Sequence, residues 1–193
     1  CGIVGITSTK EVTSRIIGSL KKLEYRGYDS AGIATISENN INEVKCEGRV
    51  NELEKNINQI KLSGTIGIGH VRWATHGKPS TINAHPHSSD NVSVVHNGII
   101  ENSTILKKIL EKKGYKFKSQ TDTEVIVHLV TDYLKKNNLK DTIIKVLKKL
   151  HGSFALGIIF KDQPDLIIGA RRGSPLAVGY GPDEHYLLSL IHI

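Results

Sequence analysis

The sequence is poor in several residue types, and each absence narrows what the protein can be. It has no methionine and only two cysteines, Cys1 and Cys46, in 193 residues. Two cysteines without a C-x-x-C pair exclude a disulfide framework and indicate a reducing cytosol. The longest apolar run, residues 154–160, is far shorter than the roughly 20 residues that a membrane-spanning helix needs. We therefore expect a soluble cytoplasmic protein without a secretory leader, in which Cys46 is an ordinary half-buried thiol.

Acidic and aromatic residues are also scarce compared with the basic ones. The formal net charge is +7, from 26 Lys and Arg against 19 Asp and Glu, and Phe, Trp and Tyr make up 5%. The lysine pairs fall late in amphipathic segments, where cations complement helix C-termini. Aromatic residues are not interleaved with them, as stacking on bases would require. We expect neither nucleic acid nor membrane as a partner, and a basic nucleic-acid-binding domain is the non-enzymatic alternative.

The order of apolar patterns predicts a single α+β domain. Helices are predicted over residues 9–23, 50–60, 102–113, 122–136 and 139–150. Strands are predicted over residues 1–6, 33–36, 43–47, 66–72, 92–96, 154–160, 166–171, 176–180 and 186–189. The helices come as a block between two sets of strands, which favours layered, largely antiparallel sheets over a parallel nucleotide-binding sheet. The glycine loops match neither G-x-G-x-x-G nor a Walker A motif.

The chain opens on the six residues CGIVGI. Because the sequence has no methionine, it is either an internal fragment or a chain whose start methionine has been removed, leaving Cys1 with a free α-amino group. In the second case one residue carries a nucleophile and a base, since an α-amino group titrates near ~8 and a thiol near ~8.5. The alternative is a small apolar strand that begins with a cysteine.

Three polar clusters follow predicted strands or precede a helix. Arg72 ends a strand and can bind a carboxylate through two hydrogen bonds, while the loop after it, residues 73–77, can close over a ligand. Asn97 and Gly98 offer an amide and a backbone N–H, enough for an oxyanion hole. Asp122 can hold an ammonium group. The alternatives are a core tryptophan beside a surface arginine, a hairpin turn ending the strand at 92–96, and helix capping by residues 121–124.

The histidines form a fourth cluster. Five of them fall between His70 and His96, and His85 and His87 could ligate zinc from a loop. No H-E-x-x-H or paired-cysteine spacing accompanies them. We expect hydrogen-bonding histidines, with no metal and no cofactor.

The motifs taken together carry a family resemblance. They are CGIVGI at the start, EYRGYDSAG at 24–32, GHVRWATHG at 69–77, NAHPH at 83–87, VVHNGIIEN at 94–102 and SQTDTEV at 119–125. In order and wording they closely resemble the glutaminase domain of the glucosamine-6-phosphate synthases, which are class II, N-terminal-nucleophile glutamine amidotransferases. The phosphoribosylpyrophosphate amidotransferases share the first and last motifs, usually differ at RWATHG and EYRGYDSAG, and are the rival family.

The resemblance implies an αββα sandwich of four layers and a role for each matched residue. Cys1 would be the nucleophile, with its own α-amino group as the general base, and Asn97 and Gly98 would form the oxyanion hole. Arg72 would bind the α-carboxylate of L-glutamine and Asp122 its α-ammonium. Four further residues would line the glutamine site and one would lie near the nucleophile: Trp73, Thr75, His76 and His85, and Arg26. The implied reaction is hydrolysis of glutamine to glutamate and ammonia through a γ-glutamyl thioester.

The resemblance runs from Cys1 to about Ser189. In the family an alanine-serine-aspartate follows a hydrophobic pair, whereas here Leu187-Leu188-Ser189 leads into residues 190–193 without the aspartate. We therefore expect a glutaminase domain at 1–189, incomplete at its C-terminus, with an atypical tail at 190–193 and an underbuilt final sheet. Such a remnant could also be inactive. The family implies a homodimeric full-length enzyme whose sugar-isomerase domain, absent here, uses the ammonia to convert fructose 6-phosphate into glucosamine 6-phosphate.

Overall fold

The computed structural model describes residues 1–191 and contains two antiparallel sheets. The six-stranded sheet has the order β3-β2-β4-β1-β10-β9, and the four-stranded sheet the order β5-β6-β7-β8. The strands are β1 (Gly2–Ser8), β2 (Ser30–Ser37), β3 (Asn40–Glu47), β4 (Ile66–Arg72), β5 (His87–Ser88), β6 (Val92–Ile100), β7 (Gly152–Phe160), β8 (Gln163–Arg172), β9 (Ala177–Tyr180) and β10 (Glu184–Leu190). The helices are α1 (Thr13–Leu23), α2 (Val50–Ile60), α3 (Ser103–Lys112), α4 (Glu124–Leu134) and α5 (Leu139–Lys149), with short 3₁₀ turns η1 (Glu24–Arg26) and η2 (Thr81–Asn83).

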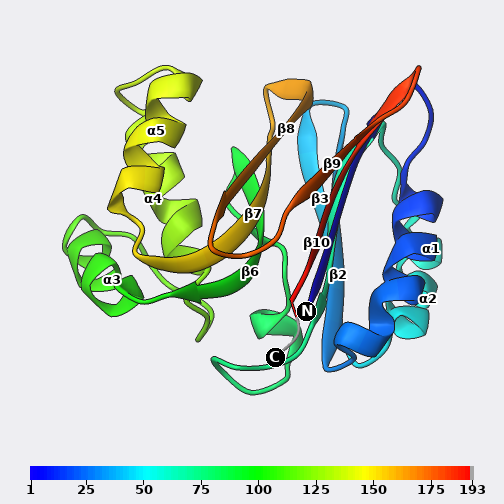
Figure 1. Cartoon of the computed structure of the whole chain (residues 1–193), viewed down its shortest axis with the longest axis horizontal. Helices are drawn as coiled ribbons and strands as arrows, with labels where there is room; N and C mark the ends of the chain where they lie inside the picture. Colours follow the sequence, from blue (N-terminus) through cyan, green and yellow to red (C-terminus); the bar gives the residue numbers. More distant parts are fainter. Residues whose placement is uncertain (192–193) are drawn as a thin grey trace.

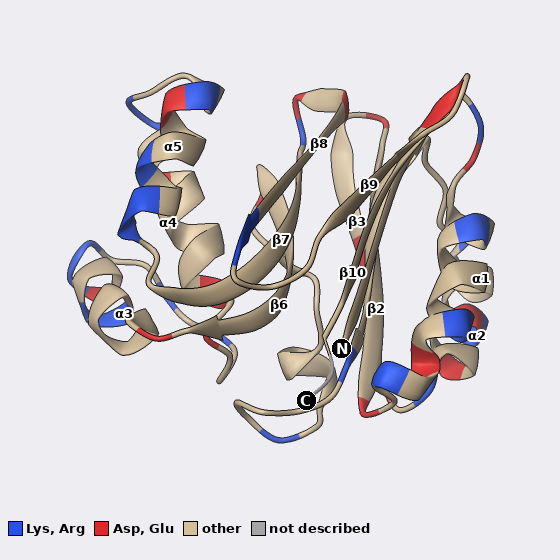
Figure 2. Cartoon of the chain, in the orientation of Figure 1, with Lys and Arg blue, Asp and Glu red and all other residues tan. Residues whose placement is uncertain are grey.

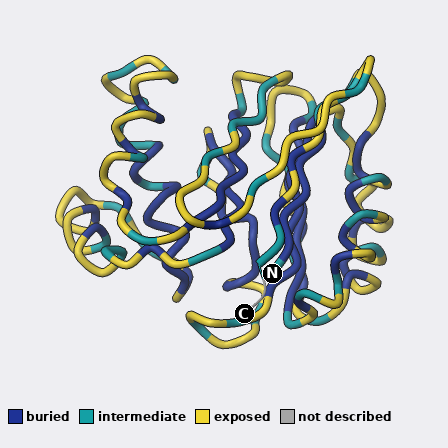
Figure 3. The backbone as a smooth tube through the Cα atoms, in the orientation of Figure 1, coloured by how far each residue is buried: buried dark blue, intermediate teal, exposed yellow. Residues whose placement is uncertain are grey.

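The helices form two outer layers around the two sheets. Figure 1 shows α1 and α2 against the outer face of the six-stranded sheet, and α3, α4 and α5 on the other side of the molecule. Three separate apolar clusters fill the gaps between these four layers: one under α1 and α2, one under α3 to α5, and one between the sheets. The backbone of the inner strands is accordingly buried, whereas the outer helices are exposed on one side (Figure 3). The αββα sandwich expected from the sequence is confirmed.

β1 lies inside the larger sheet and is buried on both faces. Its side chains alternate, with Ile3 in the cluster between the sheets and Val4 and Ile6 in the cluster under the helices. Because neighbouring strands cover both edges of β1, the start of the chain is fixed in the middle of the fold. Cys1 directly precedes this strand, at the end of the sheet marked N in Figure 1.

The strand predicted at 92–96 is longer than expected, and the alternative of a hairpin turn at Asn97 and Gly98 was wrong. β6 continues to Ile100, and Asn97 and Gly98 pair with Ala155 and Phe154 of β7. Gly98 has a φ of +117°, and a Cβ atom there would lie 2.1 Å from the carbonyl oxygen of Ser153. Only glycine therefore fits this position, and the Asn-Gly pair marks a close strand contact instead of a turn.

The prediction that residues 121–124 supply N-capping side chains was also wrong. α4 begins at Glu124, and the cap residue Thr123 makes no side-chain hydrogen bond to the helix. The carboxylate of Asp122 instead accepts the backbone N–H of Ile100 at 2.7 Å. This bond joins the segment before α4 to the end of β6, so the Asp122 carboxylate binds a strand and does not cap the helix.

The C-terminal strand completes the larger sheet more fully than expected. β10 pairs with β1 along its whole length, from Gly2 opposite Leu190 to Ser8 opposite Glu184. Leu190, predicted to start an atypical tail, belongs to this strand, while the last two residues of that tail, 192–193, lie outside the described residues. The domain boundary at 189 stays a prediction.

Two further expectations can be compared with the described residues. Cys46 is buried at 5% exposure, deeper than the half-buried thiol expected. None of the helices in the described part of the chain is long and apolar enough to cross a bilayer. The lysines and arginines lie largely on the outer helices and loops, interspersed with acidic residues, and the inner strands carry few charges (Figure 2).

Candidate active site

Cys1 is held at the end of β1 by contacts to its amine and its thiol. The α-amino group donates to the carbonyl oxygen of Arg26 at 2.5 Å and to that of Ile191 at 3.4 Å. The thiol faces the peptide group of Trp73: the Trp73 N–H lies 3.2 Å from Sγ, and Sγ lies 3.5 Å from the Trp73 carbonyl oxygen. Both reactive groups of this residue are therefore fixed by backbone contacts.

The surroundings of Cys1 favour the neutral form of its amine. Burial, aided by the positive charge of Arg26 and opposed by Asp29, lowers the pKa of the α-amino group from 8.0 to about 6. At neutral pH the amine is then mostly unprotonated and can accept a proton from the thiol next to it.

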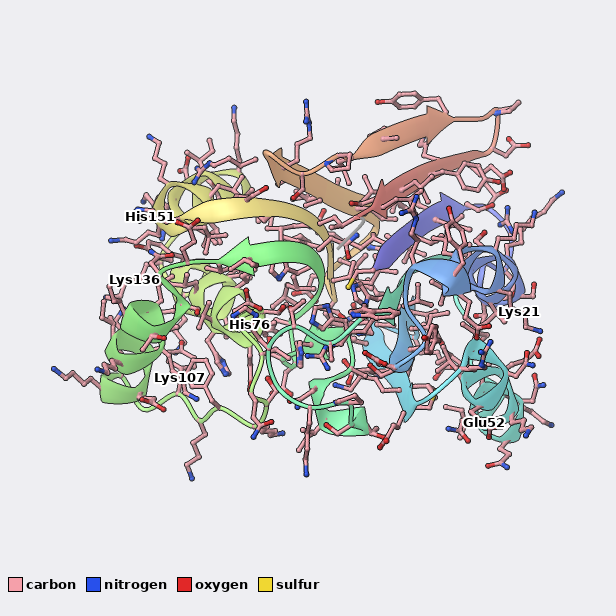
Figure 4. The ribbon with its side chains drawn as sticks, turned by 60° about the horizontal axis from the view of Figure 1, so that its bottom comes forward. Lys21, Glu52, His76, Lys107, Lys136 and His151 are labelled. Carbon is pink, nitrogen blue, oxygen red and sulfur yellow. The ribbon has the colours of Figure 1, made fainter. Side chains whose placement is uncertain are left out.

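A cavity of about 340 Å³ opens beside Cys1. Eight of the predicted site residues line it: Cys1, Arg72, Trp73, Thr75, His76, His85, Gly98 and Asp122. They come from the start of β1, the ends of β4 and β6, the loops on either side of η2 and the loop before α4. Figure 4 shows His76 between the helices that carry Lys21 and Glu52, on one side, and the helix that carries Lys107, on the other.

Arg72 supplies positive charge to the wall of the cavity. It is 4% exposed, and its guanidinium donates to the carbonyl oxygens of His76, of Gly77 at 3.2 Å and of Lys78 at 3.5 Å. These bonds shape the loop after β4 and use three of the five guanidinium N–H groups. Burial lowers the pKa of Arg72, although Asp29 and Asp122 oppose the shift. The guanidinium remains charged at neutral pH.

The segment that follows η1, residues 27–29, holds the loop after β4 in place next to Cys1. Gly27 packs against the peptide between Arg72 and Trp73 so closely that a Cβ atom would lie 2.5 Å from the Arg72 carbonyl carbon. The carboxylate of Asp29 accepts the backbone N–H of Ala74 at 2.6 Å, and the rings of Tyr28 and Trp73 meet edge to face at 5.3 Å. Residues 27–29 therefore set the position of the peptide that faces the Cys1 thiol.

Two predicted residues do not line the cavity itself. The Arg26 carbonyl oxygen accepts from the Cys1 amine, and the Arg26 guanidinium stacks over the ring of Tyr25 at 4.9 Å. Asn97 is 1% exposed and lies behind the cavity wall. Its Nδ2 donates to Ser189, at 3.3 Å to the carbonyl oxygen and 3.2 Å to Oγ. The asparagine that sequence reasoning placed at an oxyanion hole is thus hydrogen-bonded to β10 in this structure.

Cys1, with its low-pKa amine, thus lies beside a cavity that Arg72 and Asp122 also line. Comparisons with known proteins agree with such a site. Residues 71–190 match the family model described as a glutamine amidotransferase domain. The chain belongs to this family.

Individual relatives agree with this assignment. The chain is 53% identical over 188 residues to glutamine–fructose-6-phosphate aminotransferase (isomerizing) of Bradyrhizobium diazoefficiens, covering 97% of this chain and 31% of the relative. It is 53% identical over 191 residues to the enzyme of the same name from Clostridium acetobutylicum, covering 98% and 31%. The chain thus spans about a third of the length of these curated relatives, and it is homologous to their glutaminase part.

Solved structures confirm the fold. Glutamine phosphoribosylpyrophosphate amidotransferase from B. subtilis superposes with a TM-score of 0.84 at 31% identity, covering 97% of this chain and 41% of that chain. A glutamine aminotransferase class-II domain protein from Silicibacter pomeroyi has a TM-score of 0.68 at 12% identity, covering 98% and 88%, and supports the fold alone. The higher identity to the fructose-6-phosphate enzymes favours that relationship over the phosphoribosyl alternative.

Four buried histidines lie at or near the wall of this cavity. His96 Nδ1 lies 2.9 Å from the hydroxyl of Thr123, and that hydroxyl lies 3.1 Å from Nε2 of His85. Burial, the largest cause, lowers the pKa of His70, His85, His87 and His96, that of His87 to about 3. Within residues 1–191 no three His, Cys, Asp or Glu side chains are arranged to hold a metal ion. The rings form a neutral hydrogen-bonded layer.

Sequence reasoning missed several residues of this amidotransferase site. Ser189 holds Asn97, Thr123 links two histidines, and Asp29 fixes the loop after β4. Glu101 lines the cavity mouth beside Gly98. Asp29 and Glu101 stand inside the EYRGYDSAG and VVHNGIIEN motifs, so the motifs pointed to them without showing their contacts. Nothing in the local sequence around Ser189 indicates its partner.

Proposed function

We propose that this domain hydrolyses L-glutamine to L-glutamate and ammonia with Cys1 as the nucleophile. The observation that carries the proposal is the position of Cys1: a thiol and an α-amine of pKa about 6 at the edge of a cavity that also contains Arg72 and Asp122. Glutamine has a carboxylate, an ammonium and a neutral amide, and these three groups match an arginine, an aspartate and a thiol.

The reaction proceeds by covalent catalysis. The amine takes the thiol proton, and Sγ attacks the carboxamide carbon, so the C–S bond forms while the carbonyl electron pair moves to oxygen. The protonated amine of Cys1 then gives its proton to the leaving nitrogen, and the C–N bond breaks. Ammonia departs and leaves a γ-glutamyl thioester on Cys1. Water, deprotonated by the same amine, then breaks the C–S bond to give glutamate and the free thiol.

Substrate binding relies on charges at the cavity wall. Arg72 binds the α-carboxylate with the guanidinium N–H groups that do not donate to the loop carbonyls. Asp122 binds the α-ammonium with the carboxylate oxygen that does not accept from Ile100. Trp73, Thr75 and His76 are exposed residues of the loop after β4 and form the outer part of the site, while His85 lies deeper. Closing this loop over the substrate would exclude water from the reacting atoms.

The oxyanion is stabilised by Gly98 and Asn97. Gly98 lines the cavity where β6 pairs with β7, and its backbone N–H is the first donor. The Nδ2 group of Asn97 currently donates to Ser189 over distances longer than the usual 2.9–3.0 Å. A negatively charged oxygen is a stronger acceptor than a serine hydroxyl, so the bond to Ser189 Oγ is the one that yields when the oxyanion forms.

The relatives' names extend the proposal to the longer protein. In an aminotransferase that acts on fructose 6-phosphate, the ammonia released here would reach a sugar-isomerase domain and yield glucosamine 6-phosphate. A homodimeric full-length enzyme in the cytoplasm, acting in amino-sugar synthesis, belongs to the same proposal. It is supported by the 53% identity to two enzymes of that name.

The proposal is tested by measuring glutamate release from L-glutamine by the wild-type chain, Cys1→Ala and the control Cys46→Ala. N-terminal sequencing first establishes that Cys1 carries a free amine. Wild type and Cys46→Ala should release glutamate at equal rates, and Cys1→Ala should release none above background. Equal rates in wild type and Cys1→Ala would refute the assignment of the nucleophile.

A further inference from the structure

We propose that His70 is a positioning residue for Asn97, fixing the side-chain amide so that its NH₂ group, and not its oxygen, is available to the reaction. The inference deepens the proposed function and rests on it. It assigns a role to a buried histidine that lines the cavity but that neither the motif roles nor the substrate contacts use.

The hydrogen bonds of His70 determine its tautomer. Its Nε2 lies 3.0 Å from Oδ1 of Asn97 and 3.1 Å from the carbonyl oxygen of His96. A backbone carbonyl oxygen can only accept, so Nε2 must carry the hydrogen. Asn97 must then present its oxygen to His70, because an NH₂ group there would face another donor. The tautomer of one residue thus sets the amide orientation of the other.

The opposite side of Asn97 supports the same orientation. His70 on β4 and Ser189 on β10 are the two cross-strand neighbours of Ile3, so the amide spans the strand that begins after Cys1. Its Nδ2 donates to the Ser189 carbonyl oxygen. A flipped amide would place NH₂ against the Nε2–H of His70 and Oδ1 against that carbonyl oxygen, replacing two hydrogen bonds by two repulsive contacts.

The surroundings of His70 hold its ring in place. It is 1% exposed and lies 4.3 Å, centroid to centroid, from the ring of His85. Among the described residues Nδ1 has no hydrogen-bond partner, so the polar contacts of the ring are the two at Nε2, both to β6. Burial also lowers the pKa of His70 well below its usual value, so the ring stays neutral.

The consequence for catalysis is specific to the transition state. If the amide flipped, its oxygen would face the developing oxyanion, and one donor of the oxyanion hole would be lost. Such a loss typically lowers kcat by about 100- to 1,000-fold. Arg72 and Asp122 would still hold the substrate, so KM should change little.

Two substitutions of His70 separate positioning from packing. Gln carries an N–H group close to the place of Nε2, whereas Leu has similar bulk and no donor. His87→Leu is the matched control, because His87 is a buried histidine of the same layer whose Nε2 contacts Thr121, not Asn97. For each variant kcat, KM, the thermal midpoint and two affinities are measured: for glutamate, and for glutamate γ-semialdehyde, whose aldehyde adds the Cys1 thiol to form a tetrahedral oxyanion-like adduct.

We expect His70→Leu to lower kcat by about 100-fold with KM and glutamate affinity within about threefold of wild type. Its affinity for the semialdehyde should fall with kcat. His70→Gln should recover most of both, and His87→Leu should lose thermal stability without a comparable loss of kcat.

Three results would overturn the inference while leaving the proposed function intact: a folded His70→Leu with kcat near wild type, a His70→Gln no better than His70→Leu, or equal losses of semialdehyde and glutamate affinity. A wild-type chain that releases no more glutamate than Cys1→Ala would instead overturn the proposed function, and this role of His70 with it. The two failures are therefore distinguishable.

Discussion

The backbone N–H of Trp73 points at the sulfur of Cys1 across 3.2 Å, although the two residues are separated by 72 positions in the chain. A backbone donor next to sulfur stabilises a thiolate, which is the form of Cys1 that the proposed mechanism requires. The same contact connects Cys1 to the loop after β4. Arg72 donates to the Gly77 carbonyl oxygen of that loop. These contacts therefore connect Cys1, the loop after β4 and Arg72.

The pH dependence of the reaction should report the amine of Cys1. Since the amine acts only when unprotonated and its pKa is about 6, kcat/KM for glutamine should rise with pH through about 6 and level off above about 7. Rates measured from pH 4.5 to 8.5 check this. A flat profile across that range would contradict the amine as base.

Two neighbouring charges should shift this profile in opposite directions. Arg26 lowers the pKa of the amine and Asp29 raises it. Arg26→Gln should therefore move the midpoint of the kcat/KM profile to higher pH, and Asp29→Asn should move it to lower pH. The comparison is made at constant ionic strength, because salt screens such effects. Shifts of the same sign in both variants would contradict the placement of these charges around Cys1.

Arg72→Lys should impair glutamine binding more than turnover. A lysine keeps the charge but cannot bind a carboxylate with two parallel hydrogen bonds or hold the loop carbonyls at the same time. Losing a hydrogen bond to a charged group costs about 1.5–3 kcal/mol, so KM should rise about 10- to 150-fold. Arg15→Lys, on α1 and paired with Glu184, is the control and should leave KM unchanged. An unchanged KM in Arg72→Lys would exclude Arg72 from carboxylate binding.

Gly98→Ala should disrupt both the fold and the site. A Cβ atom 2.1 Å from the Ser153 oxygen, at a φ of +117°, forces β6 and β7 apart. We expect a loss of about 3 kcal/mol or more in the free energy of unfolding, or about 6–12 °C in the thermal midpoint. Gly18→Ala is the control, because nothing lies within 4 Å of its Cβ position on α1. That variant should gain about 0.5–1 kcal/mol. Equal midpoints for the two variants would refute this account of Gly98.

Acid should destabilise the protein through the buried histidines. Their folded-state pKa values lie below the unfolded value of 6.5, so the unfolded chain binds more protons as the pH falls below that value, and stability is lost. His87, with a pKa of about 3, alone accounts for about 2 kcal/mol at pH 5. The Cys1 amine acts in the same direction between pH 8 and 6. Urea unfolding at pH 8, 6.5 and 5 measures this, and a free energy of unfolding that does not fall over the range would contradict neutral histidines.

Sequence motifs predicted the cavity better than they predicted the backbone around it. Arg72, Trp73 and His76 lie in one motif at the end of a strand, and local pattern sufficed to place them together. A turn at Asn97-Gly98 was the alternative to an oxyanion hole, because that pair is common in hairpins. The outcome depended instead on β7, more than 50 positions away, which pairs with both residues. No local rule contains that partner.

The same limit explains the missed contacts around Asn97. His70, Asn97 and Ser189 come from β4, β6 and β10, and they meet only because the two sheets stack across Ile3. Asp122 showed a similar error, since capping is a local preference whereas its bond to Ile100 joins a helix start to a distant strand. Residue types were predictable, and their partners followed from tertiary packing.

The most direct test of the central claim is interception of the thioester on Cys1 by hydroxylamine. Hydroxylamine attacks a γ-glutamyl thioester to give γ-glutamyl hydroxamate, so wild-type chain turning over glutamine should form the hydroxamate at the expense of glutamate as hydroxylamine is increased. Cys1→Ala should form neither product, and Cys46→Ala should behave as wild type. Glutamate production that hydroxylamine leaves unchanged, or hydroxamate formed equally by Cys1→Ala, would contradict covalent catalysis by Cys1.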